Sequence, residues 1–200
     1  VEEEARNFKL GYAYFTRKKF DEAKPLFDAL KNSDNPYQSA AYYYAGYIAL
    51  ENGEYDEALD NLRRIENDES YGKAVPFLIA NILNQQGRYD QLKSYGEKIL
   101  DKNKAGGKSS VANFPEIMLL VGEANYQQER YADAEPFLHT YSEMRNADRG
   151  VLYRLGYAQY QMGKADEAIE NLKQAALSQD SIGQFASFYL GVLYTDQNNL

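Results

Sequence analysis

Few residues in this sequence could carry out chemistry, and their spacing does not assemble a reaction centre. His139 is the single histidine and there is no cysteine, so neither a nucleophilic set nor a zinc site can be built from these types. Carboxylates recur in one phrase, DEA, where acids suit the positive ends of helices: Asp21-Glu22, Asp56-Glu57 and Asp166-Glu167. The sequence therefore predicts a protein that is not an enzyme and holds neither cofactor nor metal.

One segment, GGKSS at residues 106–110, contains the end of a phosphate-binding P-loop pattern. The full pattern needs a glycine five residues before Gly107, where Lys102 stands, and a preceding strand, whereas helical sequence comes first here. We interpret the segment as part of a polar loop over residues 101–114, with Pro115 in the first turn of the next helix.

The net charge and the hydropathy of the sequence limit the classes of partner that the protein could bind. The net charge is -8, which argues against nucleic acid because phosphate binding needs clustered cations. The basic groups, at Arg17-Lys18-Lys19 and at lysines between 98 and 108, are not interleaved with aromatic residues. No apolar run of about 18 residues is present, so no direct membrane span is expected. The opening residues VEEEARNF are not a signal peptide.

Tyrosine is the informative residue type, with 19 copies beside no tryptophan. Each ring supplies a large contact area and each hydroxyl needs a partner. The stretch AAYYYAGYIALENGEYDEAL, residues 40–59, holds five of them. Whether these rings form a core or a binding surface depends on the elements that position them.

The elements repeat with a period near 34 residues. Glycines in apolar segments fall at 11, 46, 122, 156 and 191, with a degenerate copy at Ala80. A second repeated position lies twelve residues after each of the first five of these small residues. It is alanine in four of the five copies: Ala23, Ala58, Leu92, Ala134 and Ala168. Within one period, apolar residues at helical spacing run over 40–51 and 55–65, broken by Asn52-Gly53. Each period is thus two helices that must stack on neighbouring copies to bury their apolar faces.

This pattern resembles the tetratricopeptide repeat family, whose unit is a 34-residue helix-turn-helix. Repeat 1 shows Leu10-Gly11, Tyr14, Phe20, Ala23 and Phe27; repeat 2 shows Tyr42, Gly46, Gly53, Tyr55, Ala58 and Leu62; repeat 4 shows Met118, Gly122, Tyr131, Ala134 and Leu138; repeat 5 shows Leu152, Leu155-Gly156, Gly163, Ala168, Leu172 and Ala175. The resemblance implies an all-α fold, a right-handed superhelical solenoid, as one domain over residues 1–200. The expected repeats are 4–38, 39–72, 73–114, 115–148, 149–183 and a partial 184–200.

Repeat 3 departs from the family pattern. It has Pro76 at position 4, Ala80 for glycine, Leu92 for alanine and Gly96 at position 24. Glycine inside a helix costs about 1 kcal/mol relative to alanine, so its second helix is expected to be the loosest. Repeat 6 stops after one helix, which suggests a fragment of a larger bacterial multi-repeat protein.

In the family, positions 5, 9 and 12 of each first helix share the face that lines a concave groove. Position 9 is the strongest evidence, because its side chain is expected to point into the groove; at positions 5 and 12 the rings can equally pack between neighbouring helices. Tyr44, at position 6, is expected at a repeat boundary or rim. The candidate partner-binding residues are Phe8, Tyr12, Phe15, Tyr43, Tyr47, Asn81, Asn84, Glu123, Tyr126, Tyr153, Tyr157 and Tyr160.

These positions argue, in this register, against one family subtype, the carboxylate clamp that binds chaperone tails with lysine and asparagine at positions 5 and 9. Repeats 1 to 3 carry no cation there. The resemblance then implies a non-catalytic scaffold that binds an extended, weakly charged peptide or partner protein. Two alternatives stay open: the adaptor or sensory region of a larger enzyme or regulator, and a self-assembly module that forms homo-oligomers. The compartment is not determined, although the tyrosine-rich phrasing is similar to bacterial repeat proteins of the cell envelope.

Overall fold

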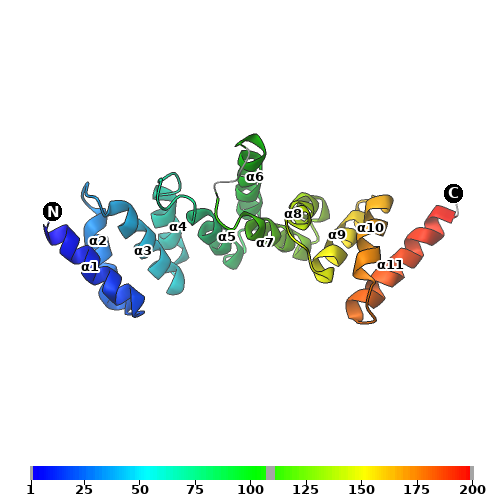
Figure 1. Ribbon diagram of the computed structural model, residues 1–200, viewed down its shortest axis with the longest axis horizontal. Coiled ribbons are helices and arrows are strands. Elements are labelled where there is room, and N and C mark those ends of the chain that lie inside the picture. The colour runs from blue at the N-terminus through cyan, green and yellow to red at the C-terminus, as the bar shows by residue number, and fades with distance from the viewer. Residues whose placement is uncertain (1, 107–110, 199–200) are drawn as a thin grey trace. The chain divides into compact units, whose positions relative to one another are not determined.

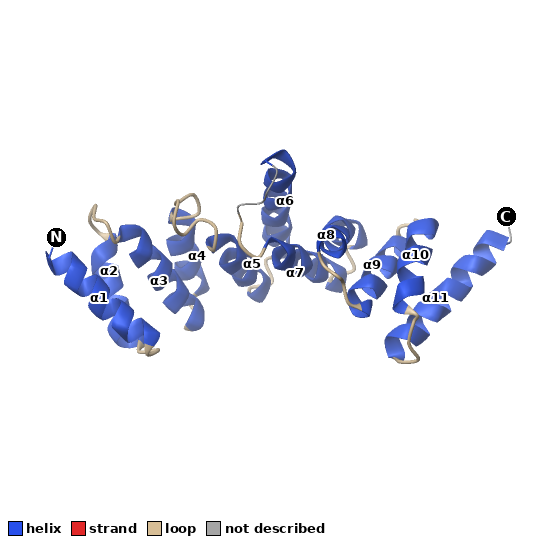
Figure 2. Ribbon diagram, viewed as in Figure 1, coloured by secondary structure: helices blue, strands red, loops and turns tan. Residues whose placement is uncertain are grey.

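The computed structural model describes residues 2–106 and 111–198, and every regular element in these ranges is an α-helix (Figures 1 and 2). The all-α fold expected from the sequence is confirmed. The helices are α1 Glu2–Thr16, α2 Phe20–Lys31, α3 Gln38–Glu51, α4 Tyr55–Arg64, α5 Val75–Gln85, α6 Tyr89–Gly106, α7 Phe114–Gln127, α8 Tyr131–Met144, α9 Arg149–Gln161, α10 Ala165–Ala175 and α11 Ser181–Asn198.

The helices group into two compact units. The first contains α1 to α5, and the second contains α6 to α11. In the first, α1 packs on α2 and α3 packs on α4; in the second, α7 packs on α8 and α9 packs on α10. Each pair lies within one expected repeat, so the helical hairpin is the building block of both units. The single-domain boundary over residues 1–200 stays a prediction.

One residue with positive φ follows the first helix of each of the five repeats. It stands at position 15 of its repeat and is glycine in three repeats, Gly53, Gly87 and Gly163, but Lys18 and Glu129 in the others. After Glu54, for example, the chain enters α4 while the Glu54 N–H donates to Ala49 O, at 2.8 Å. The left-handed backbone reverses the chain in very few residues, which lets the second helix fold back on the first.

The glycine at position 8 sets how closely two paired helices approach. A Cβ added to Gly46 would lie 2.9 Å from Leu62 Cγ, and one added to Gly122 would lie 2.7 Å from Leu138 Cδ2. Gly11 and Gly156 meet Phe27 and Leu172 in the same way. The absence of a side chain at these four glycines thus lets the paired helix backbones approach closely.

The hydrophobic core is built from residues at the repeated positions of successive helices. In the first unit, Ala23, Phe27 and Leu30 of α2 pack with Ala41, Ala45 and Ile48 of α3, all of them buried. The second unit repeats this between α8 and α9, where Ala134 and Leu138 pack with Val151 and Leu155. Helices α2 and α8 are therefore each buried between their own first helix and the next one.

The loop predicted over residues 101–114 is wrong at its start, because α6 continues to Gly106. Asp101, Lys102 and Lys104 are exposed. The final turns of a solvated helix keep their hydrogen bonds although they carry no apolar stripe. An apolar stripe is the sequence pattern that predicts a helix, so these turns were not expected. Residues 107–110, which hold most of GGKSS, lie outside the described residues. Helix α7 begins at Phe114 with Pro115 in its first turn, as expected.

Gly96 has a packing role that the sequence analysis did not foresee. It is buried within the continuous helix α6, where an added Cβ would lie 2.9 Å from Val121 and 3.1 Å from Phe137. The glycine therefore permits close contact between α6 and the α7–α8 hairpin. Whether α6 is the loosest second helix stays a prediction.

Replacing Glu129 by glycine should stabilise the protein. A side chain in the left-handed region costs about 1–2 kcal/mol, which glycine avoids. We expect Glu129→Gly to raise the free energy of unfolding by about 1 kcal/mol in urea denaturation. Gly163→Ala, at the same turn of repeat 5, should lower it by a similar amount. Equal stability of both variants and the parent chain would contradict this account.

Position 8 offers a second stability test. Alanine at Gly156 would press on Leu172, and overpacking costs about 1–3 kcal/mol. Gly191 has the same repeat position, yet no described atom lies within 4 Å of its added Cβ. We therefore expect Gly156→Ala to destabilise the chain and Gly191→Ala to stabilise it by up to about 1 kcal/mol. Thermal unfolding of the two variants measures both signs.

Candidate functional site

In the first unit, ten aromatic side chains form one network of ring contacts. This N-terminal aromatic cluster comprises Phe8, Tyr12, Phe15, Phe20, Phe27, Tyr37, Tyr43, Tyr44, Tyr47 and Tyr71. It therefore brings together five of the candidate residues, from α1 and α3. The first helices supply most of the rings because their positions 5, 9 and 12 follow one another along one helix face.

Tyr44 lies at the centre of this cluster. Its ring stacks on Phe27 at 5.1 Å between centroids and meets Phe15 edge-on at 4.8 Å. Burial, followed by the neighbouring tyrosines, raises the pKa of Tyr44 to about 12. Tyr44 thus packs α3 against α1 and α2, in agreement with its expected place at a repeat boundary.

The rings differ in their access to solvent. Tyr12 is 45% exposed, whereas Phe8, Phe15, Tyr43 and Tyr47 are half-buried. Tyr12 still meets Tyr44 edge-on at 5.6 Å. The cluster therefore contributes both to the packing of the helices and to the protein surface. Its inner rings pack the helices together, and one face of Tyr12 is exposed to solvent.

Asn81 and Asn84, both on α5, are not members of the N-terminal aromatic cluster. The Asn81 amide donates to Phe77 O at 2.9 Å, one turn back on the same helix. The backbone carbonyl of Asn84 accepts from the Gly87 N–H in the turn that follows. Both side chains are half-buried. Their expected role in a groove rests on repeat position alone.

In the second unit, a separate network of rings forms the C-terminal aromatic cluster. It comprises Tyr126, Tyr131, Tyr153, Tyr157, Tyr160, Phe185, Phe188 and Tyr189. Four candidate residues are among them, supplied by α7 and α9. The last helix, α11, adds the rings of repeat 6.

Tyr157, at position 9, is the hub of this cluster. Its ring contacts Tyr126 at 6.1 Å and Tyr189 at 4.9 Å between centroids. Its hydroxyl accepts a hydrogen bond from Gln161 Nε2 at 2.8 Å. Burial, followed by a hydrogen bond with Tyr157, raises the pKa of Tyr189 to about 12; burial likewise raises the pKa of Tyr126. Burial thus favours the neutral phenol form of Tyr126 and Tyr189.

Glu123 is not an open carboxylate. Its Oε1 pairs with Arg154 Nη2 at 2.5 Å, and both side chains are about two-thirds buried, with 33% and 32% exposed. The ion pair joins α7 to α9, at positions 9 and 6 of successive repeats. Glu123 therefore positions the helix that carries Tyr153 and Tyr157, and its charge is balanced by Arg154.

His139 and the possible metal ligands were the other candidates for site chemistry. His139 is exposed and lies 3.5 Å from Glu143 on the same helix. Across residues 2–106 and 111–198 no group of three metal-ligating side chains gathers. In the same ranges no helix is both long enough and apolar enough to cross a membrane.

Sequence reasoning missed several members of the clusters. Tyr71, after α4, contacts Tyr43 at 5.0 Å, and Tyr131, at position 17, contacts Tyr157 at 5.5 Å. Tyr189 stands at position 6, as Tyr44 does, so the shared position was an available signal. Tyr131 comes from a second helix, which the family pattern of positions 5, 9 and 12 does not include.

Because partial burial raises the pKa of Tyr44, we expect the folded protein to lose stability at alkaline pH. Unfolded tyrosine ionises near pH 10, whereas Tyr44 ionises near 12 in the folded chain. The stabilisation is complete below about pH 10 and is lost as pH rises toward 12, because only the unfolded chain ionises there. Urea denaturation at increasing pH should show this decline, and Tyr44→Phe should decline less steeply. Parallel declines would contradict the role of Tyr44.

Three comparisons with known proteins bear on identity. A family model described as tetratricopeptide repeat matches residues 8–72 and 153–200. No curated protein gave a match. Among solved structures, MamA AMB-1 is 17% identical with a TM-score of 0.64, over 86% of this chain and 89% of that one. A MamA chain from Desulfovibrio magneticus RS-1 is 13% identical with a TM-score of 0.63, over 90% and 99%.

A third solved structure is YrrB, described as a TPR protein with an unusual peptide-binding site. It is 14% identical with a TM-score of 0.62, over 88% of each chain. At these identities the likeness shows the fold. The family model covers more than half of the residues, and its segments coincide with the helical hairpins of repeats 1, 2 and 5. The chain therefore belongs to the tetratricopeptide repeat family.

Proposed function

We propose that this protein is a non-catalytic scaffold that binds extended segments of a partner protein through its two aromatic clusters. Support comes from the tetratricopeptide repeat fold and from the structural likeness to YrrB, a protein described as having a peptide-binding site. Fold alone does not give function, so the proposal rests on the side chains that the repeats present.

The observation that carries the proposal is the row of rings at positions 5 and 9 of neighbouring first helices. Phe8 stacks on Tyr12 at 6.3 Å in repeat 1, and Tyr153 stacks on Tyr157 at 6.0 Å in repeat 5. The same two positions of repeat 2 hold Tyr43 and Tyr47. Rings supply large contact areas at low entropic cost, and their hydroxyls hydrogen-bond a peptide backbone.

The chemistry favours a ligand of low charge. The carboxylate of Glu123, beside the C-terminal aromatic cluster, is already paired with Arg154. No cation occupies positions 5 or 9 of repeats 1 to 3 to receive a terminal carboxylate. A segment with apolar or aromatic side chains and an extended backbone fits these surfaces best, with Asn81 and Asn84 as further amide groups.

Removing the position-9 rings should weaken binding. Peptides selected from a random library on the 200-residue chain would serve as ligands. We expect Tyr12→Ala with Tyr47→Ala to weaken peptides bound by the first unit about tenfold or more, because buried aromatic anchors carry most interface energy. Tyr157→Ala should do the same for peptides bound by the second unit. Fluorescence anisotropy gives the affinities.

Tyr42→Ala is the matched control. Tyr42 precedes Tyr43 in the sequence but is not a member of the N-terminal aromatic cluster. Lys31 Nζ and Arg64 Cζ lie over its ring, at 5.9 and 5.6 Å from the ring centroid. Its loss should leave affinity unchanged. Circular dichroism must show that every variant is folded. Selected peptides that bind the folded position-9 variants as tightly as the parent chain would refute the proposal.

A further inference from the structure

Three phenol hydroxyls of the C-terminal aromatic cluster carry more hydrogens than they can use among themselves. The ring of Tyr157 lies 5.5 Å from that of Tyr131 and 4.9 Å from that of Tyr189, between centroids. Hydrogen bonds that join Tyr157 to both neighbours use at most two of the three phenol hydrogens. Gln161 Nε2 donates to the Tyr157 hydroxyl at 2.8 Å and cannot accept a hydrogen in return. Within this group of side chains, at least one phenol hydrogen is therefore left to donate to a ligand.

An extended ligand finds few acceptors for its own N–H groups beside these rings. Glu123 is the one carboxylate among the candidate residues, and its Oε1 already pairs with Arg154 Nη2 at 2.5 Å. Helices α7 and α9 use their backbone carbonyls in helical hydrogen bonds. Residues 2–106 and 111–198 form no strand whose edge could pair with a ligand backbone. The site therefore suits a ligand that offers carbonyl oxygens and few N–H groups.

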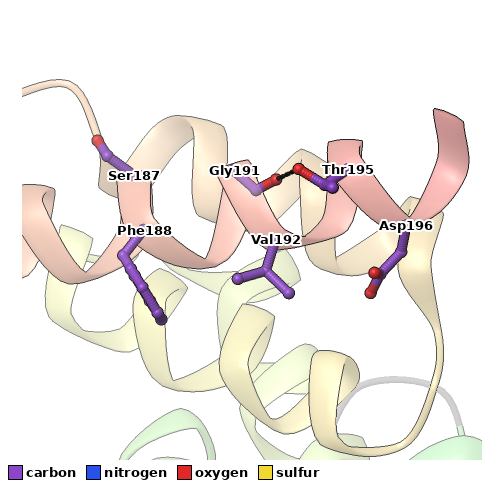
Figure 3. Close-up of a pocket in the computed structure, with 6 residues that line it drawn as sticks. All are labelled: Ser187, Phe188, Gly191, Val192, Thr195 and Asp196. Carbon is purple, nitrogen blue, oxygen red and sulfur yellow. Dashed lines mark hydrogen bonds between the residues drawn. The ribbon is translucent and has the colours of Figure 1, made fainter. Parts of the chain in front are cut away.

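Repeat 6 adds apolar groups beside the phenols but no free hydroxyl at positions 5, 9 and 12. Positions 5 and 9 of α11 are Phe188 and Val192, which line one hollow and project from the same side of the helix (Figure 3). At position 12, Thr195 Oγ1 donates its hydrogen to Gly191 O at 2.8 Å (Figure 3). Phe188 meets Tyr189 edge-on at 5.2 Å, so an apolar ring adjoins the phenols. A matching ligand therefore combines apolar groups with hydrogen-bond acceptors.

Proline-rich segments have this combination of groups. Proline has no backbone N–H, and its apolar ring packs well on aromatic rings. In the polyproline II conformation the backbone makes no internal hydrogen bonds, so its carbonyls are open to donors. A helical ligand would instead use its carbonyls internally. The fixed φ of proline also reduces the conformational entropy that the ligand loses on binding.

We propose that the C-terminal aromatic cluster binds a proline-rich segment of a partner protein in the polyproline II conformation. This inference rests on the proposed function and names the ligand of one of its two sites. The proline rings pack on Tyr157 and its neighbours, and a ligand carbonyl accepts the phenol hydrogen that the three hydroxyls leave free. Gln161 is a positioning residue, because its hydrogen bond to Tyr157 directs the Tyr157 hydrogen away from the amide and toward the other phenols or the ligand.

A labelled decaproline peptide is the probe, because proline-rich chains adopt polyproline II in water. We expect it to bind the 200-residue chain in fluorescence anisotropy, and Tyr157→Ala to abolish that binding. A decamer of N-methylglycine also lacks N–H groups but has neither the ring nor the fixed φ, so it should bind at least about tenfold more weakly. Equal binding of the two decamers would overturn the inference. So would decaproline that does not bind while selected peptides still depend on Tyr157, a result that leaves the proposed function standing.

On the protein, Gln161→Glu tests the free phenol hydrogen. The new carboxylate would accept the hydrogen of Tyr157, so the three phenols would have none left, and decaproline should bind about tenfold more weakly. Gln161→Leu removes the donor without adding an acceptor and should change the affinity by less than about twofold. Gln127→Glu is the matched control, because Gln127 is exposed, as Gln161 is, and has the same repeat position on α7. Equal affinities of Gln161→Glu and Gln127→Glu would overturn the proposal, with circular dichroism showing that each variant is folded.

Discussion

The close packing of one leucine or phenylalanine on one glycine is the contact on which each helical hairpin depends. At Gly122 an added Cβ would lie 2.7 Å from Leu138, so only a glycine lets the two backbones approach this far. That approach brings the alanine at position 20, such as Ala134, into full burial. Repeating the contact in repeats 1, 2, 4 and 5 gives these hairpins the same interior.

The aromatic surfaces follow from this arrangement. Since positions 8 and 11 of a first helix face its own second helix, positions 5, 9 and 12 are turned toward the first helices on either side. Rings such as Tyr126 and Tyr157 therefore meet across α7 and α9, at 6.1 Å between centroids. A packed row with one edge in solvent can stabilise the array and also meet a ligand, which is why one residue such as Tyr12 can serve both purposes.

Ion pairs also join successive repeats within each unit. Arg154 with Glu123 joins α9 to α7, and Lys24 with Glu57 joins α2 to α4 at 2.7 Å. Exposed pairs contribute little to stability, but a partly buried pair such as Arg154 with Glu123 costs more to break because either partner would be left uncompensated. These pairs help to keep neighbouring hairpins in register.

The sequence by itself determined the all-α fold, the helical hairpins and the positions of the close-packed glycines. These features are local or periodic: Gly46 and Ala58 recur with the repeat, and the turn at Gly53 depends on the backbone of a few residues. It also predicted which rings share a helix face. It failed at residues 101–106, where exposed polar residues extend α6 without the apolar stripe that marks a helix.

Only the tertiary structure decided which of these rings contact one another and which remain open. Tyr71 reaches Tyr43 and Tyr131 reaches Tyr157 because chain segments outside the first helices fold onto them, a proximity that no spacing within one helix encodes. The repeat position made Glu123 a candidate groove residue, and only the structure shows that its carboxylate pairs with Arg154 of the next repeat. Gly191 has the same repeat position as Gly156, and its exposure depends entirely on whether a second helix lies over it. Repeat position is a property of the chain, whereas contact and exposure are properties of its neighbours in space.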